Sequence, residues 1–215
     1  MKNQILSTEL VNKLREEIIN ETLRPGSKLT ERYVSDQYDV SRTPVREAFQ
    51  SLAAEGLIEM KPNKGAFVTG FNISEIIDMV KLRIIYEIQA AKWAAQRITE
   101  DELDSLDETI DFFKFYTKNK DVQKVKDINE VFHQNIYSAA HMRMLNYILD
   151  IFSKVVYLSP KSESYSIESL DIILEEHILI VEAIRNKDTE KAADAMKNHL
   201  TAAYERAFNE ELLLD

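Results

Sequence analysis

The chain has 215 residues, of which 45% are hydrophobic and 30% are charged, with four glycines, four prolines and no cysteine. So few helix-breaking residues favour a mainly helical globular protein, and the lack of cysteine excludes disulfides and thiolate metal sites. The N-terminus lacks the apolar core of a signal peptide, and no apolar run reaches the length of a membrane span, so we expect an unexported, cytoplasmic protein.

The formal net charge of −10 is distributed unevenly along the chain. Residues 1–70 contain ten basic and ten acidic residues, whereas the remaining residues contain 17 basic and 27 acidic ones. Net charge therefore neither favours nor excludes DNA binding by the N-terminal part. Whether this part binds DNA has to be judged from the positions of individual arginines.

The N-terminal part begins with the pattern of two helices. Apolar residues at intervals of four indicate a helix over residues 5–21, and a Pro-Gly turn ends it. Thr30 is expected to cap a short second helix, which buries Tyr33 and Val34 and ends at a tight turn around Asp39.

A third helix follows, with Ser41 as its expected cap and with two contrasting faces. The apolar face consists of Val45, Ala48, Phe49 and Leu52, and the polar face consists of Arg42, Arg46 and Gln50. Two short strands, residues 57–60 and 66–69, then flank a basic hairpin tip. Helix, short helix, turn, helix and hairpin occur in this order in a winged helix-turn-helix.

Such an arrangement binds DNA by placing the polar face of the third helix in the major groove. Arg42 and Arg46 suit this role because a guanidinium donates two hydrogen bonds to guanine and also binds phosphate. Further contacts are expected from residues at the helix start and at the hairpin tip, namely Ser41, Thr43, Lys64 and Gly65. Spacing alone leaves open that both arginines merely cover a solvated helix face.

Beyond residue 70 the pattern changes to long helices only. Gly70-Phe71-Asn72 is the natural boundary, so we predict two domains, residues 1–70 and residues 71–215. Asn72 or Ser74 is expected to cap the first helix of the second domain, and Thr99 starts the next helix. Further helices are expected at about residues 121–140, 143–158, 167–186 and 188–211. The predicted fold is mainly α: an N-terminal winged helix-turn-helix with a small hairpin wing, and a C-terminal all-helical bundle.

Three of the four histidines lie on apolar helical stripes. His133, His177 and His199 belong to three different predicted helices. Singly, each is more often a hydrogen-bonded core histidine, since burying an unsatisfied imidazole costs about 1–3 kcal/mol. Three imidazoles converging from separate helices nevertheless suit a divalent metal such as zinc, nickel or manganese. His141, at a helix end, lacks this setting and is excluded from the group.

Four N-terminal segments, residues 29–32, 40–48, 55–57 and 64–68, read LTER, VSRTPVREA, EGL and KGAFV, and they resemble the GntR family of bacterial regulators. The resemblance implies that operator DNA is contacted by Arg32, Arg42, Arg46 and Gly65, assisted by Ser41 and Thr43. Asp39 stands where the family usually has glycine, a tolerable departure because Asp accepts the left-handed conformation.

Matching pieces within residues 82–87, 132–133, 176–183 and 196–200 make residues 74–208 similar to the helical effector domain (FCD domain) of the FadR-type GntR regulators. In many relatives an aspartate four residues before the first histidine joins three histidines around a divalent metal, in a cavity that holds a small carboxylate. The resemblance therefore implies the metal ligands Asn129, His133, His177 and His199, with Asn129 at the aspartate position as a weaker, neutral ligand. Arg83 either pairs with Glu87 inside its helix or, as the resemblance allows, anchors an acidic effector.

These features predict a ligand-responsive transcription regulator that is not an enzyme. It is expected to bind a palindromic double-stranded operator as a homodimer, with a DNA affinity modulated by a small organic acid and aided by a divalent metal. It has no membrane partner. The alternative from another class is a metal-dependent enzyme that uses the three histidines, but Glu176 is expected to point away from the metal and leaves no general base. A third possibility, a protein that serves only as a scaffold, would not need the hairpin wing.

Overall fold

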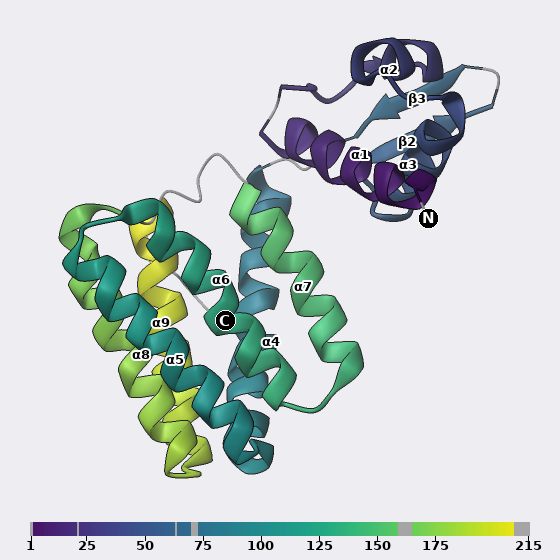
Figure 1. The fold of residues 1–215 in the computed structure, drawn as a ribbon. Coiled ribbons are helices and arrows are strands. Elements are labelled where there is room, and N and C mark those ends of the chain that lie inside the picture. Colours follow the sequence, from purple (N-terminus) through teal and green to yellow (C-terminus); the bar gives the residue numbers. More distant parts are fainter. Residues whose placement is uncertain (1, 21, 63, 70–72, 159–164, 209–215) are drawn as a thin grey trace. The chain divides into compact units, whose positions relative to one another are not determined.

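The computed structural model of the chain describes residues 2–20, 22–62, 64–69, 73–158 and 165–208 (Figure 1). The chain divides into two compact units, and the division falls between Ile76 and Ile77, within a long helix. We call them the N-terminal unit and the C-terminal unit. The predicted boundary at residues 70–72 lies outside the described residues.

The N-terminal unit combines three helices with a small antiparallel sheet. Its elements are α1 (Lys2–Ile19), β1 (Lys28–Leu29), α2 (Glu31–Tyr38), α3 (Arg42–Ala54), β2 (Ile58–Lys61) and β3 (Gly65–Val68). The strand order is β1-β3-β2, with Leu29 opposite Ala66 and Ile58 opposite Val68. The predicted hairpin is therefore present, and β1, which was not predicted, adds a third strand. Two residues are too short to show the alternation that indicates a strand.

Helix α3 packs its apolar face against α1. Val45, Ala48, Phe49 and Leu52 are all at most 2% exposed, which confirms the predicted apolar face. Tyr33 contradicts the prediction, since it is 50% exposed. Helix α2 has only eight residues and buries Val34 alone, so its narrow contact face leaves the neighbouring tyrosine in solvent.

The two predicted helix caps of this unit differ. The Thr30 hydroxyl accepts a hydrogen bond from the backbone N–H of Tyr33 at 3.1 Å, as predicted. Ser41 occupies the cap position of α3, but its side chain makes no capping bond. A capping side chain usually accepts from the second or third helical N–H, and the third residue here is Pro44, which has none.

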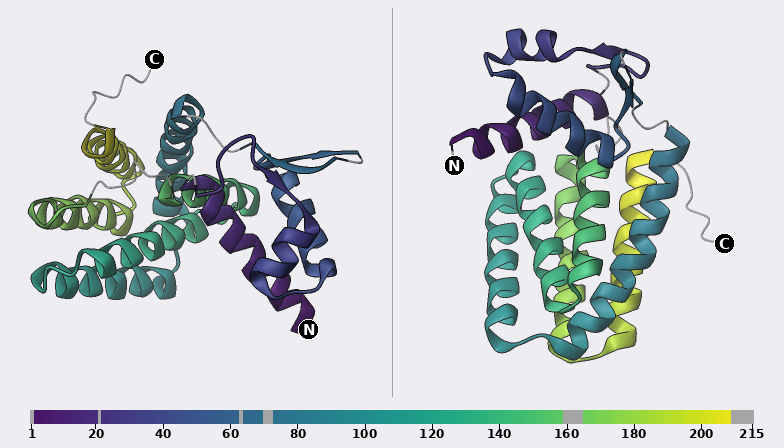
Figure 2. Two further views of the ribbon diagram at one scale, coloured as in Figure 1. Left: turned by 90° about the horizontal axis from the view of Figure 1, so that it is seen from above. Right: turned by 90° about the vertical axis from the view of Figure 1, so that its right-hand side faces the viewer.

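All elements of the C-terminal unit within the described residues are helices, and the first of them begins just before the unit does. They are α4 (Ile73–Arg97), α5 (Glu100–Lys118), α6 (Val122–Ala139), α7 (Arg143–Leu158), the short 3-10 helix η1 (Ile167–Ser169), α8 (Leu170–Arg185) and α9 (Thr189–Phe208). The long helices run side by side (Figure 2), with α5 packed against α6 and α8, and α8 packed against α9. This agrees with the predicted all-helical bundle.

Helix starts in this unit follow local chemistry. Thr99 and Glu102 form a complete capping box at the start of α5, where three acidic residues follow the cap. Helix α4 begins at Ile73, so Ser74 lies inside its first turn and does not cap it, and Asn72 lies outside the described residues. None of the helices that the structure describes is long and apolar enough to cross a membrane.

Candidate functional site

The candidate DNA-contacting residues of α3 lie on its exposed side. Arg42, Thr43 and Arg46 are exposed, as is Ser41 just before the helix. Arg46 donates through Nε to Oε1 of Glu31 at 2.8 Å, while its side chain remains 64% exposed. This hydrogen bond lowers the pKa of Glu31. Arg42 makes no hydrogen bond or ion pair with any described residue, so its guanidinium is available to a ligand.

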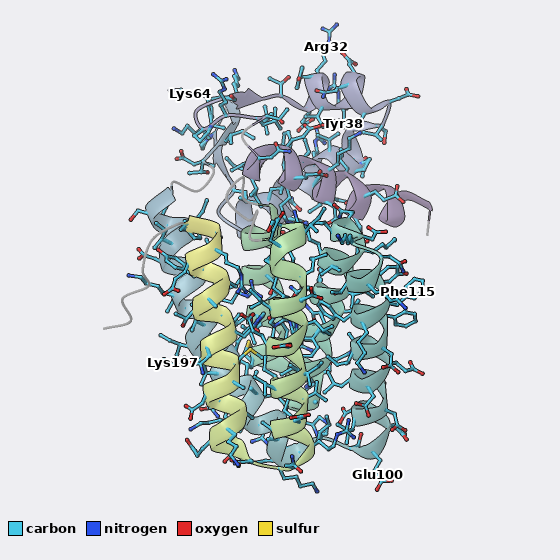
Figure 3. All side chains as sticks on the ribbon, turned by 90° about the vertical axis from the view of Figure 1, so that its left-hand side faces the viewer. Arg32, Tyr38, Lys64, Glu100, Phe115 and Lys197 are labelled. Atoms are coloured by element: carbon cyan, nitrogen blue, oxygen red, sulfur yellow. The ribbon has the colours of Figure 1, made fainter. Side chains whose placement is uncertain are left out.

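The other candidate contacts also face solvent. Arg32 is 84% exposed and lies 3.6 Å from the carboxylate of Asp36. Figure 3 shows Arg32 and Lys64 pointing away from the body of the N-terminal unit. Gly65 starts β3 with a φ of +94°, and a Cβ there would lie 3.4 Å from the carbonyl oxygen of Leu29. Backbone conformation alone therefore requires glycine at this position.

The C-terminal unit brings three histidines together in its core. His133 on α6, His177 on α8 and His199 on α9 are 3%, 0% and 3% exposed. Their nearest ring nitrogens all lie within 4.8 Å of one another. The Nε2 atoms of His133 and His199 are only 3.4 Å apart. His141, excluded at the sequence level, contacts Glu102 elsewhere at 2.8 Å.

Two glutamates contact the Nδ1 atoms of two of these histidines. Glu87 Oε2 lies 2.6 Å from Nδ1 of His133, and Glu176 Oε2 lies 2.8 Å from Nδ1 of His199. Sequence reasoning missed both contacts, because it considered Glu87 only as a partner of Arg83 and expected Glu176 to point away. The signal for Glu87 was available: it lies one turn after Ile84 on the buried side of α4 and is itself 0% exposed.

Each glutamate is also paired with an arginine. Arg83 Nε donates to Glu87 at 2.5 Å, and Arg206 donates twice to Glu176 at 2.8 and 2.9 Å. Burial alone would raise the pKa of Glu87, but Arg83 and His133 hold it well below its ordinary value. The pKa of Glu176 is likewise lowered, because the hydrogen bonds from His199 and Arg206 outweigh burial. Both carboxylates are therefore ionised.

Two of the three histidines, His177 and His199, have pKa values that keep them neutral. Burial and the neighbouring His199 and His133 hold the pKa of His177 well below its ordinary value. Burial also lowers the pKa of His199, although the Glu176 carboxylate acts in the opposite direction. Neutral imidazole is the form that ligates metal.

Several buried polar atoms at the cluster lack a partner among the described residues. They include the side-chain amide oxygen of Asn129, which precedes His133 by one helical turn, and both ring nitrogens of His177. The His177 ring lies near the backbone carbonyl of Ile173 without a well-formed hydrogen bond. The His177 ring is held by packing, with the rings of Phe113 and Phe132 centred 4.5 and 4.3 Å away. An orphaned buried polar atom is costly unless a ligand satisfies it. The three imidazoles therefore fit a divalent cation, and the amide oxygen of Asn129 is the candidate for a fourth ligand.

Arg83 was interpreted from the sequence either as a partner of Glu87 or as an anchor for an acidic effector. Its ion pair with Glu87 inside α4 is present, and its side chain is only 15% exposed. Nε donates to Glu87 and the guanidinium also interacts with the Tyr137 hydroxyl, so an acidic effector would have to reach the terminal nitrogens beside these two partners.

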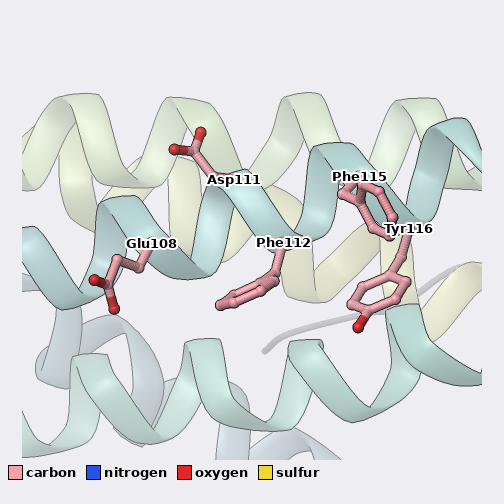
Figure 4. Close-up of a pocket in the computed structure, with 5 residues that line it drawn as sticks. All are labelled: Glu108, Asp111, Phe112, Phe115 and Tyr116. Carbon is pink, nitrogen blue, oxygen red and sulfur yellow. The ribbon is translucent and has the colours of Figure 1, made fainter.

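The hollow that Figure 4 shows lies on the outer side of α5 and is separate from the histidines. It measures about 450 Å³, is open to solvent, and is lined by Glu108, Asp111, Phe112, Phe115 and Tyr116. It holds no cationic group, so it does not suit an acidic effector.

Comparison with known proteins places both units in characterised families. Residues 6–68 match the family model "Bacterial regulatory proteins, gntR family", and residues 78–202 match the FCD domain. The HTH-type transcriptional repressor RspR of Escherichia coli K12 is 26% identical over 205 residues, which cover 93% of this chain and 90% of that protein. The gluconate operon transcriptional repressor of Bacillus licheniformis is 28% identical over 182 residues, which cover 81% of this chain and 74% of that protein.

The fold is shared with solved structures of such proteins. The structure of Escherichia coli McbR/YncC superposes with a TM-score of 0.69 at 22% identity and covers 94% of this chain and 98% of that chain. The matched families and relatives are transcription regulators and not enzymes, which agrees with the sequence-based prediction and argues against the metal-dependent enzyme. The chain belongs to the GntR family of bacterial transcription regulators and carries the FCD effector domain of the FadR-type subfamily.

Proposed function

We propose that the chain represses transcription by binding a palindromic operator as a homodimer, and that an organic acid bound at a divalent metal in the C-terminal unit changes its affinity for DNA. Residues 1–70 would bind DNA, and residues 71–215 would bind the effector and dimerise. Repression is suggested by the names of the RspR and gluconate operon relatives. A role on chromosomal DNA implies a cytoplasmic protein. The buried histidine cluster is the observation that carries the effector part of the proposal.

DNA binding is supported by the residues left exposed on α3. Arg42 makes no hydrogen bond or ion pair with a described residue and only interacts with Glu31 at longer range, whereas Arg46 must exchange its hydrogen bond to Glu31 for DNA. We assign base or phosphate contacts to Arg42 and Arg46, and supporting contacts to Arg32, Ser41, Thr43, Lys64 and Gly65. A palindromic operator follows from a two-fold dimer that presents one α3 per half-site.

Metal binding is supported by the donor set, in which His133, His177, His199 and Asn129 would be the ligands. Zinc, nickel and manganese remain the candidates, since imidazole suits several divalent ions. The ion would supply a fixed positive charge that attracts an acidic ligand.

Charge balance favours an anionic effector. All four proposed ligands are neutral, and each nearby carboxylate, Glu87 or Glu176, is already balanced by an arginine. A divalent ion here would therefore keep its charge uncompensated in a buried setting, which is unfavourable unless an anion joins it. The relative named for the gluconate operon is consistent with a carboxylate effector. Arg83 is proposed to assist through its terminal nitrogens.

The DNA-binding part is tested with operators selected by the full-length protein from a random double-stranded library. Recovery of palindromic sequences supports the dimer, and recovery of single half-sites contradicts it. Arg42→Ala should weaken operator binding by about tenfold or more. Arg24→Ala, another exposed arginine of the same unit, is the matched control. An equal loss of operator affinity in both variants would mean that Arg42 contributes only its positive charge and makes no specific contact.

The effector part is tested by elemental analysis and by thermal stability. Wild type should contain about one equivalent of metal, and His177→Ala should lose it. Gluconate should raise the melting temperature of the metal-loaded protein more than that of the chelator-treated protein, because a ligand stabilises the state that it binds. No metal after incubation with zinc, nickel and manganese would contradict the proposed site.

A further inference from the structure

We infer that Glu87 and Glu176 are positioning residues that hold His133 and His199 in a single tautomer, so that both Nε2 atoms point to one place before any metal binds. The inference deepens the proposed function, because it rests on the histidine cluster being a metal site. It adds two carboxylates whose role is to orient ligands rather than to bind the ion.

The tautomer follows from which atoms can donate. A carboxylate paired with an arginine is ionised and has no proton to give, so it can only accept hydrogen bonds. Glu87 is paired with Arg83, and Glu176 is held at both oxygens by Arg206. At the 2.6 and 2.8 Å contacts, Nδ1 of His133 and Nδ1 of His199 must therefore carry the hydrogen.

With the hydrogen on Nδ1, each Nε2 presents a lone pair. The two Nε2 atoms face each other at 3.4 Å, where two lone pairs repel unless a proton or a metal cation lies between them. Two nitrogens about 2.0–2.1 Å from a tetrahedral zinc are roughly 3.4 Å apart. The structure thus holds the pair at the separation that a shared ion requires.

The third histidine provides an internal comparison. No carboxylate contacts the His177 ring among the described residues, and the polar group near it is the backbone carbonyl of Ile173. No carboxylate therefore determines its tautomer, whereas those of His133 and His199 are determined in advance. Orientation of metal-ligating histidines by carboxylates typically contributes 10- to 100-fold to metal affinity.

The direct test is the tautomeric state in the full-length protein after chelator treatment. Long-range ¹H–¹⁵N correlation spectra of the histidine rings distinguish hydrogen on Nδ1 from hydrogen on Nε2. We expect the Nδ1–H tautomer for His133 and His199. A predominant Nε2–H tautomer at either ring would overturn the inference, whether or not the wild type binds metal.

The energetic test uses Glu176→Gln, because Glu176 is partly exposed and its loss is tolerated more easily than that of the fully buried Glu87. The glutamine amide can donate as well as accept, so it no longer fixes the hydrogen on Nδ1 of His199. We expect zinc affinity, measured by competition with a chromogenic chelator, to fall about 10- to 100-fold.

Glu102→Gln is the matched control, since Glu102 contacts His141 at 2.8 Å away from the cluster. It should leave zinc affinity unchanged. Unchanged zinc affinity in Glu176→Gln would overturn the inference. Operator affinity without effector should be the same in wild type and both variants, so failure of DNA binding by the wild type would count against the proposed function and not against this inference.

Discussion

Each unit contains an ion pair between an arginine and a glutamate, but the two pairs differ in burial. In the N-terminal unit an arginine and a glutamate, Arg46 and Glu31, meet at the surface, where their side chains are 64% and 34% exposed. In the C-terminal unit Arg83 and Glu87 make the equivalent pair inside the core, with Glu87 fully buried. A surface pair is cheap to exchange for another partner, whereas a buried pair is costly to break. Substitutions at the candidate DNA contacts should therefore hardly change the free energy of unfolding. Substitutions around the candidate effector site should lower it.

The largest expected effect tests this contrast directly. Glu87→Ala removes the partner of both Arg83 and His133 and leaves buried polar groups unpaired, so the free energy of unfolding should fall by about 3–5 kcal/mol. Glu31→Ala, its surface counterpart, should leave the urea midpoint unchanged. Far-ultraviolet circular dichroism follows unfolding of both units, and fluorescence of Trp93, the only tryptophan, follows unfolding of the C-terminal unit. Comparable destabilisation by both variants would remove the distinction.

The stability of the metal-free C-terminal unit, which contains the buried histidines, should depend on pH. The pKa values of His177 and His199 are lowered in the folded state, so the unfolded state binds more protons near its ordinary pKa of about 6.5. Stability is therefore full above that pH and declines below it, by up to about 1.4 kcal/mol per histidine and pH unit. Denaturation followed by Trp93 between pH 7 and pH 5, with chelator present, should show this decline. A flat profile would mean that these rings are not buried neutral.

A smaller effect is expected when the surface pair is broken in favour of DNA. Glu31→Gln should raise operator affinity by a factor of a few, because it frees Arg46 and removes a negative charge near phosphate. Glu47→Gln, also an exposed glutamate and on α3 itself, controls for the general change of charge. Lower affinity in Glu31→Gln would mean that Glu31 orients Arg46 for DNA rather than competing for it.

The smallest effect concerns backbone strain at turns of the two units. Asp39 and Lys187 both adopt left-handed conformations, with φ of 50° and 54°. Lys187→Gly should stabilise the protein by about 0.5–1 kcal/mol, because glycine meets no steric cost there. Asp39→Gly should give less, since Asp is among the residues that best tolerate this conformation. Thermal melts of the two variants measure both gains, and a loss at Lys187 would show that its side chain makes a contact that matters.

Local sequence chemistry predicted most helices of this chain. Thr99 and Glu102 make a capping box and Thr30 makes a cap because these bonds join residues three apart, which the sequence displays directly. The same holds for the apolar face of α3. Ser41 and Tyr33 were misjudged because the outcome depended on a neighbouring proline and on how wide a face α2 buries.

By itself, the sequence determined the order of the long helices and the hairpin, the exposed arginines of α3 and the presence of three histidines on apolar stripes, since helical periodicity assigns each residue to a face. Only the tertiary structure decided that His133, His177 and His199 share one cluster, that Glu87 and Glu176 stand behind two of them, and that Arg206 holds Glu176. Periodicity indicates which side of a helix is buried, but it does not say which side chain of another helix lies opposite. That depends on how α4, α6, α8 and α9 pack together, and hence on contacts such as that between His133 and His199, which are 66 positions apart.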